Sequence, residues 1–478
     1  MGTPAATEEA EQPAPDPTQT AWTATAYLVP VILGLVSTLG AVDLAYHLRT
    51  GEGILADLAL PSIDTFTFSV DGARWVDQQW GAQVVLWLTF RLGGWPGLVV
   101  LQAALGAVSF GFIFMAARAR GASARLAAAL TLAGFLMAYP MITLRPQLVA
   151  LPLFAAALWA AATRKDHPRR SWIIPLGALL AVNMHGSFTL FPVIAMLVVL
   201  QDLADRAEDL RRSAIVLGAT VIATFANPFG VSVWTYAFDL STDPVIRESI
   251  TEWAPVSVAT SMGAIMLASV LLVGAILARR TRPASWLDLL TLAVFLILAL
   301  SAMRAILWWA MVAPIVLAGL IRDRRGEKRD PSSPRGPAVI LIGGLTMAIV
   351  ALLPWWRGTG ASTHVEGAPL GVTRALERLG PETRIFSYQP WGSWFIYALR
   401  DDRVFVDSRI EIVPESVWQD YFQVAFARAR WKEALVTWRP DAVVADNEEW
   451  AEIIELLEED RTWRLYYEDD EGTIFVPR

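Results

Sequence analysis

The sequence predicts a polytopic α-helical membrane protein, with about eleven transmembrane helices, that ends in a soluble α/β domain. The first observation is composition: of 478 residues, 55% are hydrophobic and 18% charged, with a mean hydropathy of +0.43. A soluble chain is nearer 45–50% apolar, and one soluble core rarely exceeds about 250–300 residues. The second is a series of long apolar segments before residue 357, and the third is alternation of β-rich and helical patterns after it.

Apolar segments long enough to cross a hydrocarbon core of about 30 Å recur through the region 22–356. Before them, residues 1–21 are rich in Pro, Ala and acids and lack Lys and Arg, which predicts a disordered tail and no signal peptide. Residues 81–92 are too short to span and are expected to lie along the interface. The predicted spans are 24–42, 95–117, 123–143, 146–163, 172–184 (a short one), 187–203, 213–229, 259–278, 286–302, 305–321 and 337–356.

Positive charges fall in alternate loops, which predicts the orientation because Lys- and Arg-rich loops stay cytoplasmic. The clusters are Arg118, Arg120 and Arg125; Arg164, Lys165, Arg169 and Arg170; Arg206, Arg211 and Arg212; Arg279, Arg280 and Arg282; and the run from Arg322 to Arg335. With a cytoplasmic N-terminus, all of them lie inside. The loops 43–94 and 230–258 and the domain 357–478 are then extracytoplasmic.

The domain 357–478 is expected to hold a small parallel or mixed sheet flanked by helices. Its β-rich runs are 384–388, 403–407 and 441–446, its helical patterns are 415–437 and 448–460, and a hairpin is expected to turn at Asp-Glu-Gly near the C-terminus. The strands carry no Gly-rich nucleotide fingerprint and the chain has no Walker sequence, so ATP-driven pumping has no support.

Charge and cysteine content exclude several classes of function. The net charge of −7 gives no basic excess for nucleic acid. The absence of cysteine excludes disulfides, thiol catalysis and Cys-ligated metals, and four histidines make a polyhistidine metal centre improbable.

Polar residues gather at the predicted outer ends of the spans. Ionisable residues at membrane depth cost free energy, about 2.5–3.5 kcal/mol for a charge at a helix centre. The polar residues are Asp43, His47, Arg49, Asp64, Asp71, Asp77, Arg145 in LRPQ, His185 in NMHGS, Asn227 in NPFG, Glu252 in TEW and Arg304 in SAMR. Taken singly, such groups often cap or snorkel, and His185 is equally well explained as a packing residue. Asp57, Asp64 and Asp71 are typical turn residues. The one-sidedness of the set is what predicts a reaction cavity.

The chemistry of the set has two parts. Asp43 and His47 are four residues apart and would share a helix face if the first helix continues past the membrane. A carboxylate beside an imidazole suits general base catalysis, or metal binding together with Asp77. Arg145 and Arg304 lie at the same level and match the oxygens of a phosphate. Trp75, Trp80 and Trp253 lie in the polar loops and could stack on a sugar.

These motifs resemble a known superfamily. The sequence contains D-x-x-x-H-L-x-x-G-E from Asp43 to Glu52, W-V-D-x-x-W from Trp75 to Trp80, LRPQ at 144–147, N-x-H-G at 183–186, NP-x-G at 227–230, and EW at 252–253. Their order resembles the GT-C superfamily of integral-membrane glycosyltransferases, and most of all its bacterial mannosyl- and aminoarabinosyltransferase-like members.

The resemblance implies roles for several residues. Asp43 would be the general base or, with Asp77 as the second acid, a ligand of Mg²⁺ or Mn²⁺, with His47 beside it in the catalytic group. Arg304 and Arg145 would hold the lipid phosphate, and His185, Glu252 and Trp253 would complete the substrate site. Many members have two adjacent acids at the first position, whereas Leu44 follows Asp43 here. A metal-free base mechanism therefore stays open.

The function implied is transfer of a hexose or pentose from a polyprenyl-phosphate donor to a glycan, lipid or protein acceptor of the cell envelope, on the outer face of a bacterial cytoplasmic membrane. The C-terminal domain would recognise the acceptor or a partner, through the QPWGSW segment with Asp407 and Arg409. The alternatives are a transporter or flippase of lipid-linked intermediates, which should show paired halves that this sequence lacks, and a non-catalytic scaffold of envelope assembly.

Overall fold

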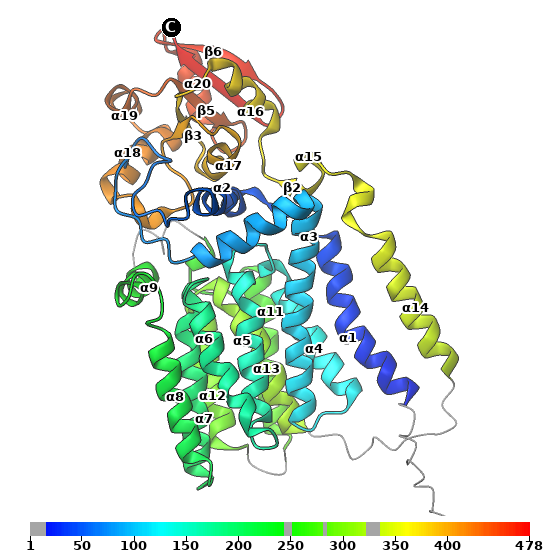
Figure 1. The fold of residues 1–478 in the computed structure, drawn as a ribbon. Coiled ribbons are helices and arrows are strands. Elements are labelled where there is room, and N and C mark those ends of the chain that lie inside the picture. The colour runs from blue at the N-terminus through cyan, green and yellow to red at the C-terminus, as the bar shows by residue number, and fades with distance from the viewer. Residues whose placement is uncertain (1–15, 243–250, 281–283, 322–334) are drawn as a thin grey trace, which may run out of the picture.

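The computed structural model describes residues 16–242, 251–280, 284–321 and 335–478, and shows a helical bundle with a C-terminal α/β domain on one end (Figure 1). Each predicted span corresponds to a helix of the bundle. These are α1 (Pro17–Val36), α3 (Trp80–Ala119), α4 (Ala124–Ala138), α5 (Pro146–Thr163), α6 (Ile173–Ala181), α7 (Leu190–Ala204), α8 (Leu210–Ala223), α11 (Ser261–Ala278), α12 (Trp286–Ser301), α13 (Ile306–Ile321) and α14 (Arg335–Ala351).

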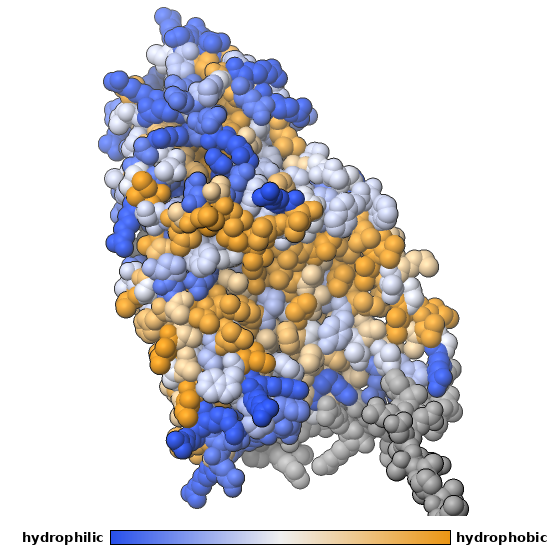
Figure 2. Space-filling view, viewed as in Figure 1, coloured by the Kyte–Doolittle hydropathy of each residue, from blue (hydrophilic) through white to orange (hydrophobic). Residues whose placement is uncertain are grey.

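The predicted class of polytopic membrane protein is confirmed. Within the described ranges, seven helical segments are long and apolar enough to cross a membrane, and α12 and α14 are shorter apolar helices. Figure 2 shows the apolar surface gathered over the middle of the bundle, between a hydrophilic C-terminal domain and a hydrophilic opposite end. Helices fit this setting because all their backbone polar groups are paired within the segment.

The N-terminal boundary differs from the expectation. Residues 17–21 belong to the first turns of α1, and the rest of the predicted tail, 1–15, lies outside the described residues. The helix begins here because Asp16 caps it, accepting the Thr18 N–H at 2.9 Å, and because Pro17 suits a first helical position.

The predicted span 24–42 is also wrong at its end. The helix α1 stops at Val36, residues 39–40 pair with 365–366 as the parallel strands β1 (Leu39–Gly40) and β2 (Val365–Glu366), and a separate helix α2 (Ala41–Asp57) follows. Asp43 and His47 therefore lie on α2, between the bundle and the C-terminal domain, and not on an extension of the first span (Figure 1).

The long helix α3 bends at Gly94, whose φ of 61° and ψ of −157° break the helix at a position that favours glycine. Residues 80–93 lie across the end of the bundle and residues 95–119 run along it (Figure 1). The sequence predicted this separation of 81–92 from the following span.

The C-terminal domain holds a five-stranded mixed sheet, as predicted. Its strands are β3 (Arg384–Ser387), β4 (Arg403–Val404), β5 (Ala442–Asp446), β6 (Trp463–Glu468) and β7 (Gly472–Pro477), in the order β4-β3-β5-β7-β6. Strand β3 is parallel to β4 and β5, and the β6–β7 hairpin pairs antiparallel with β5. The flanking helices include α16 (Leu370–Leu376), α17 (Gln389–Ala398) and α20 (Ala451–Glu459).

One predicted helix of this domain is two separate helices in the structure. Residues 415–437 form α18 (Glu415–Ala425) and α19 (Trp431–Trp438). The interruption falls at Ala427, which has a φ of 47° and so cannot continue a right-handed helix.

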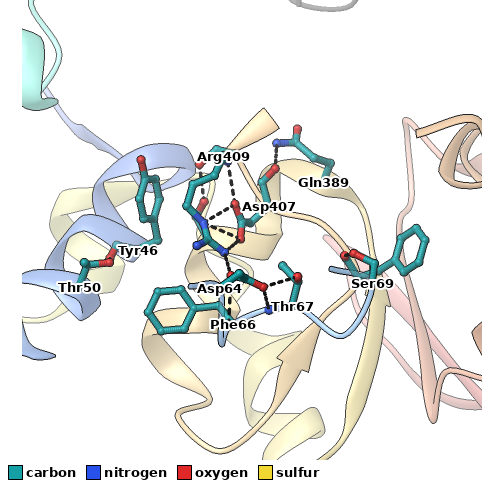
Figure 3. Close-up of polar contacts among 12 residues, drawn as sticks. Tyr46, Thr50, Asp64, Phe66, Thr67, Ser69, Gln389, Asp407 and Arg409 are labelled. Atoms are coloured by element: carbon teal, nitrogen blue, oxygen red, sulfur yellow. Dashed lines mark hydrogen bonds and ion pairs between the residues drawn. The ribbon is translucent and has the colours of Figure 1, made fainter. Parts of the chain in front are cut away.

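A buried ion cluster joins the first outer loop to this domain (Figure 3). The Arg409 Nη2 atom lies 2.6 Å from Asp64 Oδ1 and 2.6 Å from Asp407 Oδ2, and all three side chains are at most 1% exposed. The guanidinium Cζ stands 4.5 Å from the ring centre of Trp75, which is itself buried.

This cluster corrects three expectations. Asp407 and Arg409 are no recognition surface, because they are inside the domain junction. Trp75 is not accessible for stacking on a sugar. Asp64 does shape a turn, accepting the Thr67 N–H at 3.1 Å, but it also fixes the loop to the C-terminal domain.

Candidate active site

A cavity of about 1080 Å³ lies where the end of the bundle meets the C-terminal domain. Residues from α2, the start of α5, the turns before α7 and α13, and helix α9 (Ser232–Thr242) line it together with the C-terminal domain. Seven of the eight predicted site residues are among them: Asp43, His47, Arg145, His185, Glu252, Trp253 and Arg304.

Arg145 lies between two carboxylates at the entrance to α5. The residue before a proline is restricted to extended backbone, and Arg145, with φ −133° and ψ 167°, stands outside the helix that Pro146 begins. Its Nε atom is 3.0 Å from Asp43 Oδ2, and its Nη1 atom donates to both oxygens of Glu252, at 2.7 and 3.0 Å. The charge of Arg145 is therefore already matched by protein acids.

Arg304 has a different environment. Its Nη2 atom donates to Gln147 Oε1 at 3.3 Å, its Cζ atom lies 4.5 Å from the ring centre of Trp253, and among the described residues no carboxylate lies within ion-pairing distance of it. The Nε2 atom of His185 is 3.4 Å away.

His185 has a donor next to each ring nitrogen. Its Nδ1 atom is 3.1 Å from the backbone N of Ser187, and its Nε2 atom faces Arg304 Nη2. A neutral imidazole has one acceptor nitrogen, so it accepts one of these two hydrogen bonds at a time. The Arg304 guanidinium, with no carboxylate within ion-pairing distance among the described residues, is the group here that suits an anion.

Asp77 is the predicted residue that does not line the cavity. It is buried, its Oδ1 atom accepts Gln83 Nε2 at 2.8 Å, and the same amide nitrogen is 3.2 Å from His47 Nδ1. Burial raises the pKa of Asp77 to about 7 and, with help from Arg145, lowers the pKa of His47 to about 3. Asp77 is thus linked to His47 through the Gln83 amide and does not line the cavity.

The metal site predicted at Asp43 and Asp77 does not fit this arrangement. The Asp43 carboxylate is bound by Arg145, and Asp77 is directed to Gln83 outside the cavity lining. The parts of the chain that the structure describes contain no group of three His, Asp or Glu residues placed to hold a metal ion. We therefore derive no step through a metal.

Two further cavity residues, Tyr236 of α9 and Glu411 of the C-terminal domain, were not anticipated. The Tyr236 hydroxyl donates to Glu411 Oε1 at 3.0 Å, and burial raises the pKa of Glu411. Neither residue stands in a motif, and they meet only because the domain packs on the bundle. By contrast, two quoted motifs do meet: Trp80 Nε1 donates to Asn183 Oδ1 at 3.1 Å.

No protein-family model and no curated protein sequence matches the chain significantly. Solved structures do. AglB, an archaeal oligosaccharyltransferase from Archaeoglobus fulgidus in complex with an inhibitory peptide and a dolichol-phosphate, matches with a TM-score of 0.57 and 13% identity over 96% of this chain and 74% of that chain. ArnT from Cupriavidus metallidurans, bound to undecaprenyl phosphate, matches with a TM-score of 0.52 and 14% identity over 96% and 97%.

The apo state of the same ArnT matches with a TM-score of 0.53 and 15% identity over 95% of this chain and 96% of that chain. At these identities the similarity establishes the fold alone: the chain shares the fold of AglB and ArnT.

Proposed function

We propose that the protein is a membrane glycosyltransferase that transfers a sugar from a polyprenyl-phosphate donor to a cell-envelope acceptor on the outer face of the cytoplasmic membrane. The observation that carries the proposal is the Arg304 guanidinium, which lines the cavity and has no carboxylate within ion-pairing distance among the described residues. A donor phosphate would supply the missing anion.

The two arginines then have separate tasks. Arg145 already binds Asp43 and Glu252, so we assign it to positioning these acids. Arg304 is assigned to the phosphate, because a fixed guanidinium in a partly dry cavity stabilises the negative charge that grows on a leaving phosphate. Both arginines were expected to bind the phosphate, and this assignment gives that role to Arg304 alone.

Asp43 is assigned as the general base. Its Oδ2 atom is held by Arg145, while Oδ1 has no hydrogen-bond partner among the residues described and can accept a proton. In the reaction, the acceptor hydroxyl loses its proton to Asp43 as its oxygen bonds to the anomeric carbon. The bond from that carbon to the phosphate oxygen breaks, and polyprenyl phosphate leaves with the electron pair.

The distribution of basic residues supports an outer-face site. The helices α3, α5 and α7 end near Arg118, Arg164 and Arg206. These helix ends lie at the end of the bundle opposite the C-terminal domain (Figure 1). Positive loops favour the cytoplasm, which supports a cavity on the outer face. The basic residues at 282 and within 322–334 fall outside the described residues. The lipids named in the two similar structures, dolichol-phosphate and undecaprenyl phosphate, support the donor class.

The proposal is tested with the purified full-length protein. Binding of undecaprenyl phosphate is measured for the wild type, for Arg304→Ala and for Arg49→Ala, a control on α2 whose side chain does not line the cavity. Loss of a charge-assisted hydrogen bond predicts a 10- to 100-fold higher Kd for Arg304→Ala only. A panel of undecaprenyl-phosphate hexoses and pentoses then reports sugar transfer.

Three results would overturn the proposal. Equal Kd values for undecaprenyl phosphate in Arg304→Ala and Arg49→Ala would show that Arg304 does not bind the phosphate. Movement of a lipid-linked sugar across vesicles without transfer to any acceptor would favour a flippase, and lipid binding without either activity would favour a scaffold.

A further inference from the structure

A row of aromatic side chains on α18 forms part of the cavity wall. Trp418, Phe422 and Phe426 follow one another at intervals of four residues, which places them on one face of the helix and its C-cap, and all three line the cavity that contains Arg304. The Trp418 and Phe422 rings are 5.8 Å apart at 27°, and the Phe422 and Phe426 rings 5.5 Å apart at 19°. The three rings are therefore nearly parallel. We call them the α18 row.

The α18 row leads from the rim of the cavity to its interior. Trp418 is 5% exposed, Phe422 is half-buried and Phe426 is 57% exposed. At a rise of 1.5 Å per residue, the row spans about 12 Å. A row of this length exceeds a single monosaccharide ring.

One polar atom in the row has no partner. The indole N–H of Trp418 is buried and makes no hydrogen bond, although buried indole N–H groups usually find an acceptor. Gln389 and Glu449 line the same cavity and add polar groups to its wall. A ligand here must therefore present both apolar faces and hydrogen-bonding groups.

We infer that the α18 row binds a saccharide acceptor longer than one sugar unit, an inference that rests on the proposed function. A sugar offers C–H faces to aromatic rings and hydroxyl oxygens to the Trp418 N–H. An acyl chain has no acceptor for that N–H, which would stay unpaired. A peptide can also bring a carbonyl acceptor to that N–H, so transfer to a peptide is one of the outcomes tested below.

The division of the cavity agrees with this inference. Helix α2 and the bundle supply Asp43, Arg145 and Arg304, the charged groups suited to a base and a phosphate, whereas α18 supplies uncharged aromatic surface. We therefore expect the donor phosphate beside Arg304 and the acceptor along the α18 row, with the two meeting near Asp43.

The first test is saccharide binding without donor. Saturation-transfer NMR compares a series of oligosaccharides of increasing length against the full-length protein, Trp418→Phe and Phe426→Leu. Trp418→Phe keeps a ring and removes the N–H, and it should weaken binding about 10-fold. Phe426→Leu lies at an exposed rim, where folding is least at risk, and should abolish the preference for longer chains.

The matched control is Trp438→Phe in the same domain. Trp438 donates its indole N–H to Asp420 and does not line the cavity, so this variant should bind saccharides as the wild type does. Unchanged binding in both Trp418→Phe and Phe426→Leu would overturn the inference.

A second test offers saccharides, peptides and lipids as acceptors to the protein with undecaprenyl-phosphate sugars. Transfer to a saccharide, with KM raised about 10-fold in Trp418→Phe at unchanged donor Kd, is the expected result. Transfer to a peptide or a lipid alone would overturn the acceptor class and leave the proposed function standing. Saccharide binding without donor binding or transfer would instead reject the proposed function.

Discussion

Arg145 holds Asp43 through its Nε atom at 3.0 Å and so ties the start of α5 to the first turns of α2. The same guanidinium binds Glu252 through Nη1. The position of the proposed base therefore depends on a residue from a distant part of the chain, and the geometry of the site depends on both ends of this contact.

Replacing either partner should reduce transfer while donor binding persists. Arg145→Lys keeps the charge but cannot reach both carboxylates with a fixed fork, and a displacement of about 1 Å can cost about 100-fold in rate. Asp43→Asn removes the base and should lower kcat by about 10² to 10⁴. Initial rates and undecaprenyl phosphate binding are the measurements. Arg400→Lys, which alters a more exposed pair with Glu52, is the control. Transfer by Asp43→Asn at the wild-type rate would disprove the base assignment.

The sequence predicted the features that depend on local composition. Long apolar segments predicted the bundle helices, and motifs such as LRPQ and NMHGS marked positions at helix ends that now surround one cavity. The residue before a proline favours extended backbone, so the position of Arg145 outside the helix could be predicted from sequence alone.

Contacts across the domain junction could not be predicted in this way. Glu411 reaches Tyr236, and Arg409 reaches Asp64, only because distant segments pack together. The position of Asp77 outside the cavity lining was missed for a similar reason: its carboxylate accepts a hydrogen bond from Gln83 of α3. Hydrophobic pattern and spacing carry no information about such long-range pairs.

Asp77 should make stability depend on pH. Burial raises its pKa to about 7 from an ordinary 3.8, so the folded protein holds a proton that the unfolded chain releases. This contribution to stability is complete below about pH 4, is lost as pH rises to about 7, and amounts to about 1.4 kcal/mol per pKa unit. Asp77→Asn should remove it.

The measurement is thermal unfolding at pH 5 and pH 8. Relative to the wild type, Asp77→Asn should gain stability at pH 8 compared with pH 5, whereas the exposed Asp57→Asn should not. An identical pH dependence in wild type and Asp77→Asn would show that Asp77 is ionised across this range.

Gly51 allows α2 to approach α3. A Cβ atom at position 51 would lie 2.3 Å from the Gln83 carbonyl oxygen and 2.9 Å from Trp87 Cβ, so Gly51→Ala should separate the helices and cost about 1–3 kcal/mol. Because Gln83 also contacts His47 and Asp77, transfer should fall as well.

Gly53 is the matched control on the same helix. A Cβ atom there would meet nothing within 4 Å, so Gly53→Ala should stabilise the protein by about 0.5–1 kcal/mol through helix propensity. Scanning fluorimetry of the two variants makes the comparison, and equal melting temperatures would mean that α2 and α3 do not pack this closely.

Arg409–Asp64 and Arg403–Asp71 are two of the ion pairs that join the first outer loop to the C-terminal domain, and they differ in burial. Arg409 is enclosed with Asp64 and Asp407, whereas Arg403 and Asp71 are 45% and 51% exposed at a distance of 2.7 Å. Removing one partner of a buried pair leaves uncompensated charge, so Arg409→Met should cost about 3–5 kcal/mol. Arg403→Ala should cost less than about 1 kcal/mol, because exposed pairs are screened by water.

The Arg409→Met variant should also lose transfer, since Glu411 lies two residues further along and reaches the cavity through this junction. Limited proteolysis between residues 58 and 79 and hydrogen exchange over 404–411 report whether the loop separates from the domain. Opening in Arg409→Met with protection in Arg403→Ala is the expected pattern. Equal protection in both variants would mean that backbone pairing between the loop and β4, such as the Phe68 N–H to the Val404 carbonyl at 3.0 Å, holds the junction without the ions.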